Sequence, residues 1–108
     1  MAESLDVLVV YVPRQSTDAV LAALFGAGAG RIGDYEECAF VAAGRGQFRP
    51  VPGANPTIGA LGDVEYVDED RVEVVLPRGQ RSAAVAALRA AHPYEEPAFH
   101  VVETAPVD

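Results

Sequence analysis

The chain repeats itself at an offset of 64 residues. Two Pro-Arg pairs, Pro13-Arg14 and Pro77-Arg78, mark the repeat, and each follows an apolar segment and precedes an alanine-rich one. Identical residues recur at the same offset, namely Val10 and Val74, Ala19 and Ala83, Ala22–Leu24 and Ala86–Leu88, and Ala27 and Ala91. The repeat therefore predicts two copies of a strand, a Pro-Arg turn and a helix.

Both alanine-rich segments carry one apolar stripe at helical spacing. The first helix is expected to begin near Ser16, whose hydroxyl can cap it, and to end at the glycines from Gly26 onward. The second helix is expected from Ser82 to Ala91, because Pro93 prevents its continuation. The two predicted stripes are Val20, Leu21, Leu24 and Ala27, and Ala84, Val85, Leu88 and Ala91.

The remaining apolar or alternating segments predict strands. They are Leu5–Val12, Tyr35–Ala43, a hairpin of Asp63–Val67 and Arg71–Leu76 about a turn at residues 68–70, and Ala98–Glu103. With residues 44–70 set aside as an inserted loop and an extra strand, the order is βαββαβ. Right-handed crossovers then give an α+β, ferredoxin-like split βαβ sheet with both helices on one face, and residues 1–108 are expected to form one domain.

The first predicted strand is apolar on both sides. Leu5, Val7, Val9 and Tyr11 alternate with Leu8, Val10 and Val12, and in the last strand Ala98 and Val102 lie opposite Phe99 and Val101. A strand that is apolar on both faces needs a cover on both, yet the helices cover only one. We therefore expect the open face to pack against another copy of the chain.

Charge limits the classes of partner. The chain has 8 basic residues, all arginine, against 16 acidic ones, a net charge of −8, which disfavours nucleic acid and anionic membrane surfaces as partners. No basic leader segment and no apolar run of membrane-spanning length is found, so a cytoplasmic location is predicted. The single cysteine, Cys38, excludes a disulfide within the chain.

Two segments are rich in glycine. Residues 28–33 match the dinucleotide pattern GxGxxG, but a helix precedes them and a strand follows, so a helix end and a tight return are favoured over a nucleotide site. Residues 44–62 form an unusually long predicted loop that carries Arg45 and Arg49. These arginines could bind an anion, or they could pair with the chain's own surplus carboxylates.

Both histidines lie close to two carboxylates near the C-terminus. His92, Glu95, Glu96 and His100 could bind a divalent metal ion. The alternative is that His92 hydrogen-bonds the end of the second helix while the glutamates are solvated. Cys38 is expected in the core, alternating with Phe40, although a catalytic pair with His92 or His100 stays an alternative.

Several uncommon strings occur in order along the chain, namely residues 28–40, 44–50, 53–56, 58–59, Glu65, residues 71–73 and residues 92–98. Together they resemble the insert domain of the YqfO branch of the Nif-three-like family. The resemblance implies a PII-like, CutA-like fold, a ferredoxin-like unit that assembles into trimers. The sequence differs from the family pattern at His100, where the family is expected to have an aspartate.

The resemblance also limits the predicted function. The resemblance implies that the family's dinuclear metal centre is built by lobes that flank the insert, so this chain is not expected to reproduce it. We predict a non-catalytic homo-oligomer, a trimer, that binds a small ligand or ion at clefts between subunits. The predicted ligand-binding residues are Arg45, Arg49, His92, Tyr94, Glu95 and Glu96. The alternatives are a divalent-metal-binding protein of the metal-tolerance (CutA) type and a Cys/His-dependent enzyme.

Overall fold

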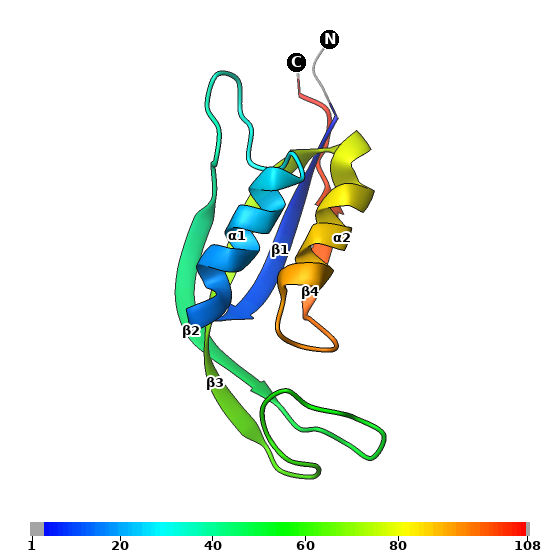
Figure 1. Ribbon diagram of the computed structural model, residues 1–108. Coiled ribbons are helices and arrows are strands. Elements are labelled where there is room, and N and C mark those ends of the chain that lie inside the picture. The colour runs from blue at the N-terminus through cyan, green and yellow to red at the C-terminus, as the bar shows by residue number, and fades with distance from the viewer. Residues whose placement is uncertain (1–3, 108) are drawn as a thin grey trace.

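The computed structural model describes residues 4–107 and contains one antiparallel sheet of four strands in the order β2-β3-β1-β4. The strands are β1 (Leu5–Pro13), β2 (Phe40–Phe48), β3 (Glu65–Pro77) and β4 (Phe99–Glu103). Two helices, α1 (Thr17–Gly26) and α2 (Arg81–Ala91), lie side by side across one face of the sheet (Figure 1). The predicted βαββαβ order and α+β fold are confirmed. No helix within residues 4–107 is long and apolar enough to cross a membrane.

The core lies between the helices and the sheet. It contains the residues of β1 that face the helices together with alternate residues of β3 and one stripe from each helix. The fully buried members are Leu8, Val10, Val12, Val20, Leu24, Val72, Leu76, Ala84 and Leu88. The period of two in the strands and the helical stripes thus converge on a single apolar layer.

The two Pro-Arg pairs adopt the same local structure. Pro13 (φ −52°, ψ 136°) and Pro77 (φ −59°, ψ 136°) each end a strand and precede a single 3-10 turn that leads into a helix. The predicted cap at Ser16 is wrong, because its side chain makes no capping hydrogen bond. The 3-10 turn leads directly into α1 at that point, and Ser16 is part of that turn.

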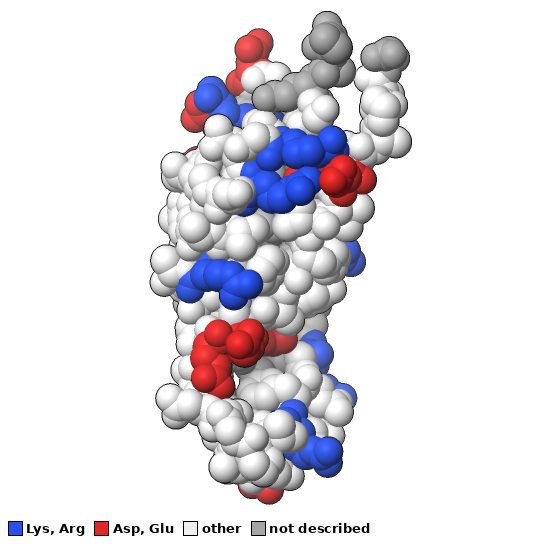
Figure 2. All heavy atoms as spheres, turned by 90° about the vertical axis from the view of Figure 1, so that its right-hand side faces the viewer, with Lys and Arg blue, Asp and Glu red and all other residues white. Residues whose placement is uncertain are grey.

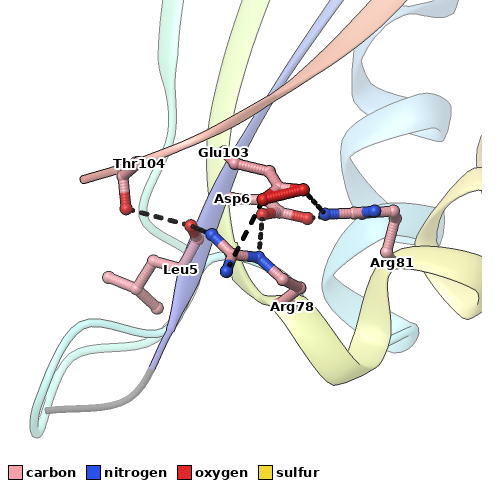
Figure 3. Close-up of polar contacts among 6 residues, drawn as sticks. All are labelled: Leu5, Asp6, Arg78, Arg81, Glu103 and Thr104. Carbon is pink, nitrogen blue, oxygen red and sulfur yellow. Dashed lines mark hydrogen bonds and ion pairs between the residues drawn. The ribbon is translucent and has the colours of Figure 1, made fainter. Parts of the chain in front are cut away.

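The repeat extends to two buried aspartates that the arginines of the opposite copy bind. Asp6 accepts hydrogen bonds from Arg78 Nε at 2.8 Å and Arg81 Nε at 2.6 Å (Figure 3). At the equivalent place in the other copy, Asp70 accepts from Arg14 Nε at 3.4 Å and Thr17 Oγ1 at 2.7 Å. Each strand's aspartate thus anchors the turn and helix that follow the other strand.

The Asp6 cluster is the more strongly charged of the two. Glu103 also approaches both arginines, Arg78 at 3.7 Å and Arg81 at 3.3 Å (Figure 3). The hydrogen bond from Arg81 is the largest cause that lowers the pKa of Asp6 below its usual value; desolvation by burial opposes it, and the bond from Arg78 adds to it. Asp6 therefore stays ionised although its side chain is fully buried.

The predicted hairpin about residues 68–70 is wrong. Residues 65–77 form one continuous strand, and β2 extends to Phe48, so the long loop covers residues 49–64 rather than 44–62. β1 pairs only with residues 69–77 of β3, which leaves residues 65–68 and 45–48 as a two-stranded arm beyond the rest of the sheet (Figure 1). Charged residues are tolerated there because the arm is largely exposed to water.

The face of the sheet away from the helices is partly apolar. Val102, Val7 and Val75 lie side by side across β4, β1 and β3, and the adjacent row brings Phe40 next to Glu73. Phe40 is 67% exposed and Val102 is 51% exposed, whereas Val9 is already buried by its neighbours. The structure thus confirms the apolar character of this face, and assembly through it stays a prediction.

The glycine-rich residues 28–33 carry the chain from α1 back to the sheet, as predicted. Gly30 has φ +86° and donates its N–H to the carbonyl of Val75 at 2.7 Å. A side chain at this position would overlap the ring of Phe25, so only glycine fits. Cys38 follows this loop and lies outside both β2 and the core, contrary to its predicted buried place in a strand, and Phe40 is exposed.

Candidate functional site

A pocket of about 270 Å³ lies between the loop of residues 49–64 and the segment that joins α2 to β4. β1 and β3 contribute one residue each, Tyr11 and Glu69, and the end of β2 contributes Gln47 and Phe48. The two loops contribute Arg49, Pro50, Ala54, Pro56, Thr57, Ile58, Tyr94, Glu95, Glu96 and Ala98. The lining is therefore mostly apolar and aromatic, with a few charged groups, as is usual for small-molecule sites.

Two hydrogen bonds join the loops that form the pocket. The backbone N–H of Asn55 donates to Glu95 Oε1 at 2.9 Å, and Thr57 Oγ1 donates to the carbonyl of Pro93 at 2.8 Å. Within the longer loop, the N–H of Gly62 donates to the carbonyl of Pro50 at 2.7 Å. These contacts hold the end of the arm against the body of the molecule and give the pocket a defined shape.

His92 hydrogen-bonds two residues that line the pocket, Tyr11 and Tyr94. Its side chain is buried, its Nδ1 accepts the N–H of Tyr94 at 3.1 Å, and its Nε2 lies 2.8 Å from the carbonyl oxygen of Tyr11. Since Nδ1 accepts, Nε2 carries the proton and donates to Tyr11. Both ring nitrogens are thus used by the backbone, so neither offers a lone pair to a metal ion.

Tyr94 is the central residue of the pocket. Its ring packs edge-on against Phe48 with 5.8 Å between centroids, and its hydroxyl is buried without a hydrogen-bond partner among the described residues. Burial raises the pKa of Tyr94 to about 12. The Glu69 carboxylate, which lies close to the hydroxyl but without the geometry of a formed hydrogen bond, and the charge of Glu65 add to that effect. A buried hydroxyl without a partner is costly in a folded protein and is therefore uncommon.

The predicted site residues are only partly brought together. Arg49, Tyr94, Glu95 and Glu96 line the pocket, but Arg45 does not. Arg45 belongs to β2 rather than to a loop, and its guanidinium stacks on the ring of Tyr66 at 4.7 Å. Arg45 was expected in a loop, but β2 extends to Phe48, so Arg45 lies within the arm next to Tyr66 and not at the pocket.

The structure does not gather the four predicted metal ligands. No group of three or more His, Cys, Asp or Glu side chains within residues 4–107 is placed to hold a metal ion. His92 is committed to the backbone, Glu95 binds Asn55, and His100 lies on β4 beside Val9.

The Cys/His alternative is also not supported by the arrangement. The thiol of Cys38 lies 3.7 Å from the carbonyl oxygen of Glu36. The backbone N–H of Cys38 donates to the carbonyl of Gly30, and the N–H of Gly30 donates to the carbonyl of Val75. His92 contacts Tyr11, toward the other end of β1, and His100 belongs to the opposite edge of the sheet. Cys38 is therefore remote from both histidines.

Residues that the sequence did not indicate complete the pocket, chiefly Tyr11, Phe48 and Glu69. Glu69 was assigned to a turn, and its place beside β2 follows only from the pairing of Gly44 with Glu69 and of Gly46 with Val67. Gly46 of the Gly-Arg-Gly string was the available signal, because the Glu69 side chain occupies the space that a side chain at Gly46 would fill.

A second depression near the end of α1 is larger, about 410 Å³. It is lined by Ala22, Phe25, Gly26, Gly28, Ala29, Arg31, Glu36 and Glu37. Arg31 and Glu36 already pair there at 2.9 Å and are exposed, so its charged groups satisfy one another. The pocket beside Tyr94 is therefore the stronger candidate.

The chain is similar in sequence to one part of longer proteins. No family model matches the chain. It is 56% identical over 105 residues to the GTP cyclohydrolase 1 type 2 homolog of Mycobacterium tuberculosis, covering 97% of this chain and 28% of that protein. The Bacillus subtilis protein of the same name is 44% identical over 108 residues, covering 98% of this chain and 29% of that protein.

A solved structure decides the relationship. The Bacillus cereus protein related to NIF3 superposes with a TM-score of 0.84 at 37% identity, over 98% of this chain and 27% of that one. The chain is homologous to the insert domain of NIF3-like proteins. It spans less than a third of the length of these NIF3-like relatives. The resemblance found in the sequence is thereby confirmed.

More distant structures share only the fold. The divalent cation tolerance protein of Thermus thermophilus has a TM-score of 0.68 at 17% identity, over 96% of this chain and 87% of that one. CutA from Archaeoglobus fulgidus has a TM-score of 0.65 at 13% identity, over 96% and 84%. The predicted CutA/PII-like fold of this chain is therefore confirmed.

Proposed function

We propose that this chain is a non-catalytic, oligomeric module that binds a small molecule in the pocket between the arm and the α2–β4 segment. The observation that carries the proposal is the buried hydroxyl of Tyr94, which lines this pocket without a hydrogen-bond partner among the described residues. A polar group left in that state costs stability, and a bound ligand that satisfies it would offset the cost.

The apolar face of the sheet supports the oligomeric part of the proposal, with a homotrimer as the expected assembly. The row of Val102, Val7 and Val75 lies near the start of β1, whereas the arm projects beyond the other end of β1 (Figure 1). The proposal is that a copy packed on this face extends over the length of the sheet and brings the pocket to a cleft between subunits. The net charge of −8 argues against nucleic acid and anionic membranes as partners.

The non-catalytic part rests on the separation of Cys38 from both histidines and on the use of His92 by the backbone. The activity for which the longer relatives are named would then depend on parts of those proteins outside the homologous segment. The proposal includes a cytoplasmic location, where a free cysteine such as Cys38 stays reduced.

An NMR screen of ¹⁵N-labelled protein against small aromatic fragments of positive, neutral and negative charge tests the binding site. We expect shift changes at the amides of Phe48, Thr57 and Tyr94, and Tyr94→Phe is expected to weaken binding about tenfold. Without a fragment, the same variant should unfold no more easily than the wild type, since it removes a buried group without a partner.

Tyr35→Phe is the matched control, because Tyr35 is 74% exposed and distant from the pocket. It should leave fragment binding unchanged. If no fragment of any charge shifts the pocket amides, or if the shifts gather instead around Phe25 and Arg31, the proposed site is wrong.

Assembly is tested by Val102→Glu. A carboxylate in the centre of an apolar subunit contact would be desolvated without a partner, so we expect the variant to be monomeric at micromolar concentration by light scattering. Val102 is half exposed, so the single chain should still fold. Val107→Glu, at a position 77% exposed outside the strands, should keep the wild-type mass, and a monomeric wild type would contradict the proposal.

A further inference from the structure

The pocket has an unbalanced charge. Three carboxylates line it, those of Glu69, Glu95 and Glu96, against one guanidinium, that of Arg49. None of the three glutamates forms an ion pair with an arginine among the described residues. The arginines that do form ion pairs bind other carboxylates, and they are Arg14, Arg31, Arg71, Arg78 and Arg81. Acidic side chains gather on this side of the molecule between the helical body and the tip of the arm (Figure 2).

The Glu69 carboxylate occupies the space that a side chain at Gly46 would fill. A Cβ atom at Gly46 would overlap the carboxylate of Glu69, so that carboxylate lies flat against the backbone of β2. Glu69 is half buried, whereas Arg49 is exposed and free to extend into water. The fixed negative charge therefore dominates the inner part of the pocket.

The inner polar groups suit a ligand that donates hydrogen bonds. Glu69 accepts only, and the hydroxyl of Tyr94 can accept from a ligand N–H with either lone pair. The rings of Tyr11, Phe48 and Tyr94 also line the pocket, and aromatic faces attract cations. An anion would meet three carboxylates and a single exposed arginine, so its binding is disfavoured.

We infer that the pocket binds a small organic cation, an ammonium or amidinium group on a flat or apolar body, with Glu69 and Tyr94 at its charged end. This inference rests on the proposed function and adds the chemical class of the ligand. A bare metal ion fits less well, because the lining is mostly apolar and the described residues hold no cluster of three metal-binding side chains.

Three probes of nearly equal shape and different charge test the inference. They are benzamidine, which is a cation at pH 7, benzamide, which is neutral, and benzoate, which is an anion. By titration calorimetry with the full chain at low salt, we expect benzamidine to bind at least tenfold more tightly than benzamide, and benzoate to give no heat.

Two variants place the effect at Glu69. Glu69→Gln should weaken benzamidine binding at least tenfold, while Glu73→Gln, on the same strand and face but outside the pocket, should leave it unchanged. Gly46→Ala keeps every charge but displaces the Glu69 carboxylate, so it should also weaken binding. Long-range attraction by the chain's net charge would instead leave Gly46→Ala equal to the wild type.

The outcomes separate this inference from the proposed function. Tighter binding of benzoate, lost in Arg49→Ala, would overturn the cationic ligand but keep the pocket as a binding site. The cationic ligand would likewise be overturned if all three probes bound equally. It would also be overturned if none of the three bound while other fragments still shifted the pocket amides. Failure of every fragment at these amides would overturn both.

Discussion

Replacing Leu8 by alanine is expected to lower the free energy of unfolding by about 2–5 kcal/mol. Leu8 is fully buried in β1, and its partners across the sheet, Val74 and Val101, pack against the same core. The strands on both sides prevent the backbone from closing the space that the side chain leaves. Urea unfolding at fixed protein concentration measures the change, since assembly would couple stability to concentration.

Leu61→Ala provides the control for the core substitution. Leu61 is 53% exposed in the loop of residues 49–64, so its truncation should change the free energy of unfolding by less than about 0.5 kcal/mol. A loss of less than about 1 kcal/mol for Leu8→Ala would contradict a close-packed core at that position.

The second large effect is expected at Asp6. Asp6→Asn removes a fully buried carboxylate that binds two arginines, and leaves Glu103 as the acidic partner of Arg78 and Arg81 within residues 4–107. We expect the variant to melt at a lower temperature than the equivalent substitution in the other copy, Asp70→Asn. Asp70 binds one arginine at a longer distance, 3.4 Å, and its second partner is the hydroxyl of Thr17.

The loss at Asp6 should depend on pH in one direction. The folded state lowers the pKa of Asp6 below the value of 3.8 that it has when unfolded, so its stabilisation is fully present above pH 3.8. It is lost as the pH falls below 3.8 through the folded pKa. Thermal melts should therefore show a gap between wild type and Asp6→Asn at pH 7 that narrows in acid, and a gap that is constant with pH would contradict this role.

The repeat explains how much of the fold could be predicted. Pro13 and Pro77 each fix a backbone angle and end a strand. The apolar residues that follow each proline recur at helical spacing, which predicts a helix in both places. Local signals of this kind need no knowledge of distant residues. The four-stranded order and the placement of both helices on one face follow from them through the handedness of the crossovers.

Strand ends were predicted less well where pairing rather than local pattern decides them. Residues 68–70 resemble a turn because all three are acidic, but they pair with residues 43–45 of β2 and continue the strand. Asp70 is acceptable there because Arg14 and Thr17, more than fifty residues earlier, satisfy its carboxylate. No short stretch of sequence contains that information.

The pocket was predicted in part for the same reason. The string from His92 to Glu96 drew attention by its composition, and three of its residues line the pocket. The role of His92 was missed, because its ring bonds to a residue 81 positions away, Tyr11. Arg45 was expected in a loop, whereas it lies in β2, where its guanidinium stacks on Tyr66 outside the pocket.

The sequence by itself determined the architecture, because proline, glycine and apolar periodicity act on neighbouring residues and leave few topologies open. The tertiary structure alone decided which charges are satisfied and which are not. Asp6 and Asp70 are each bound by the opposite copy of the repeat, whereas Glu69 lies against Gly46 and the Tyr94 hydroxyl has no hydrogen-bond partner within residues 4–107. Those contacts join residues far apart in the chain, and their energies depend on distance and burial, which only the folded chain fixes.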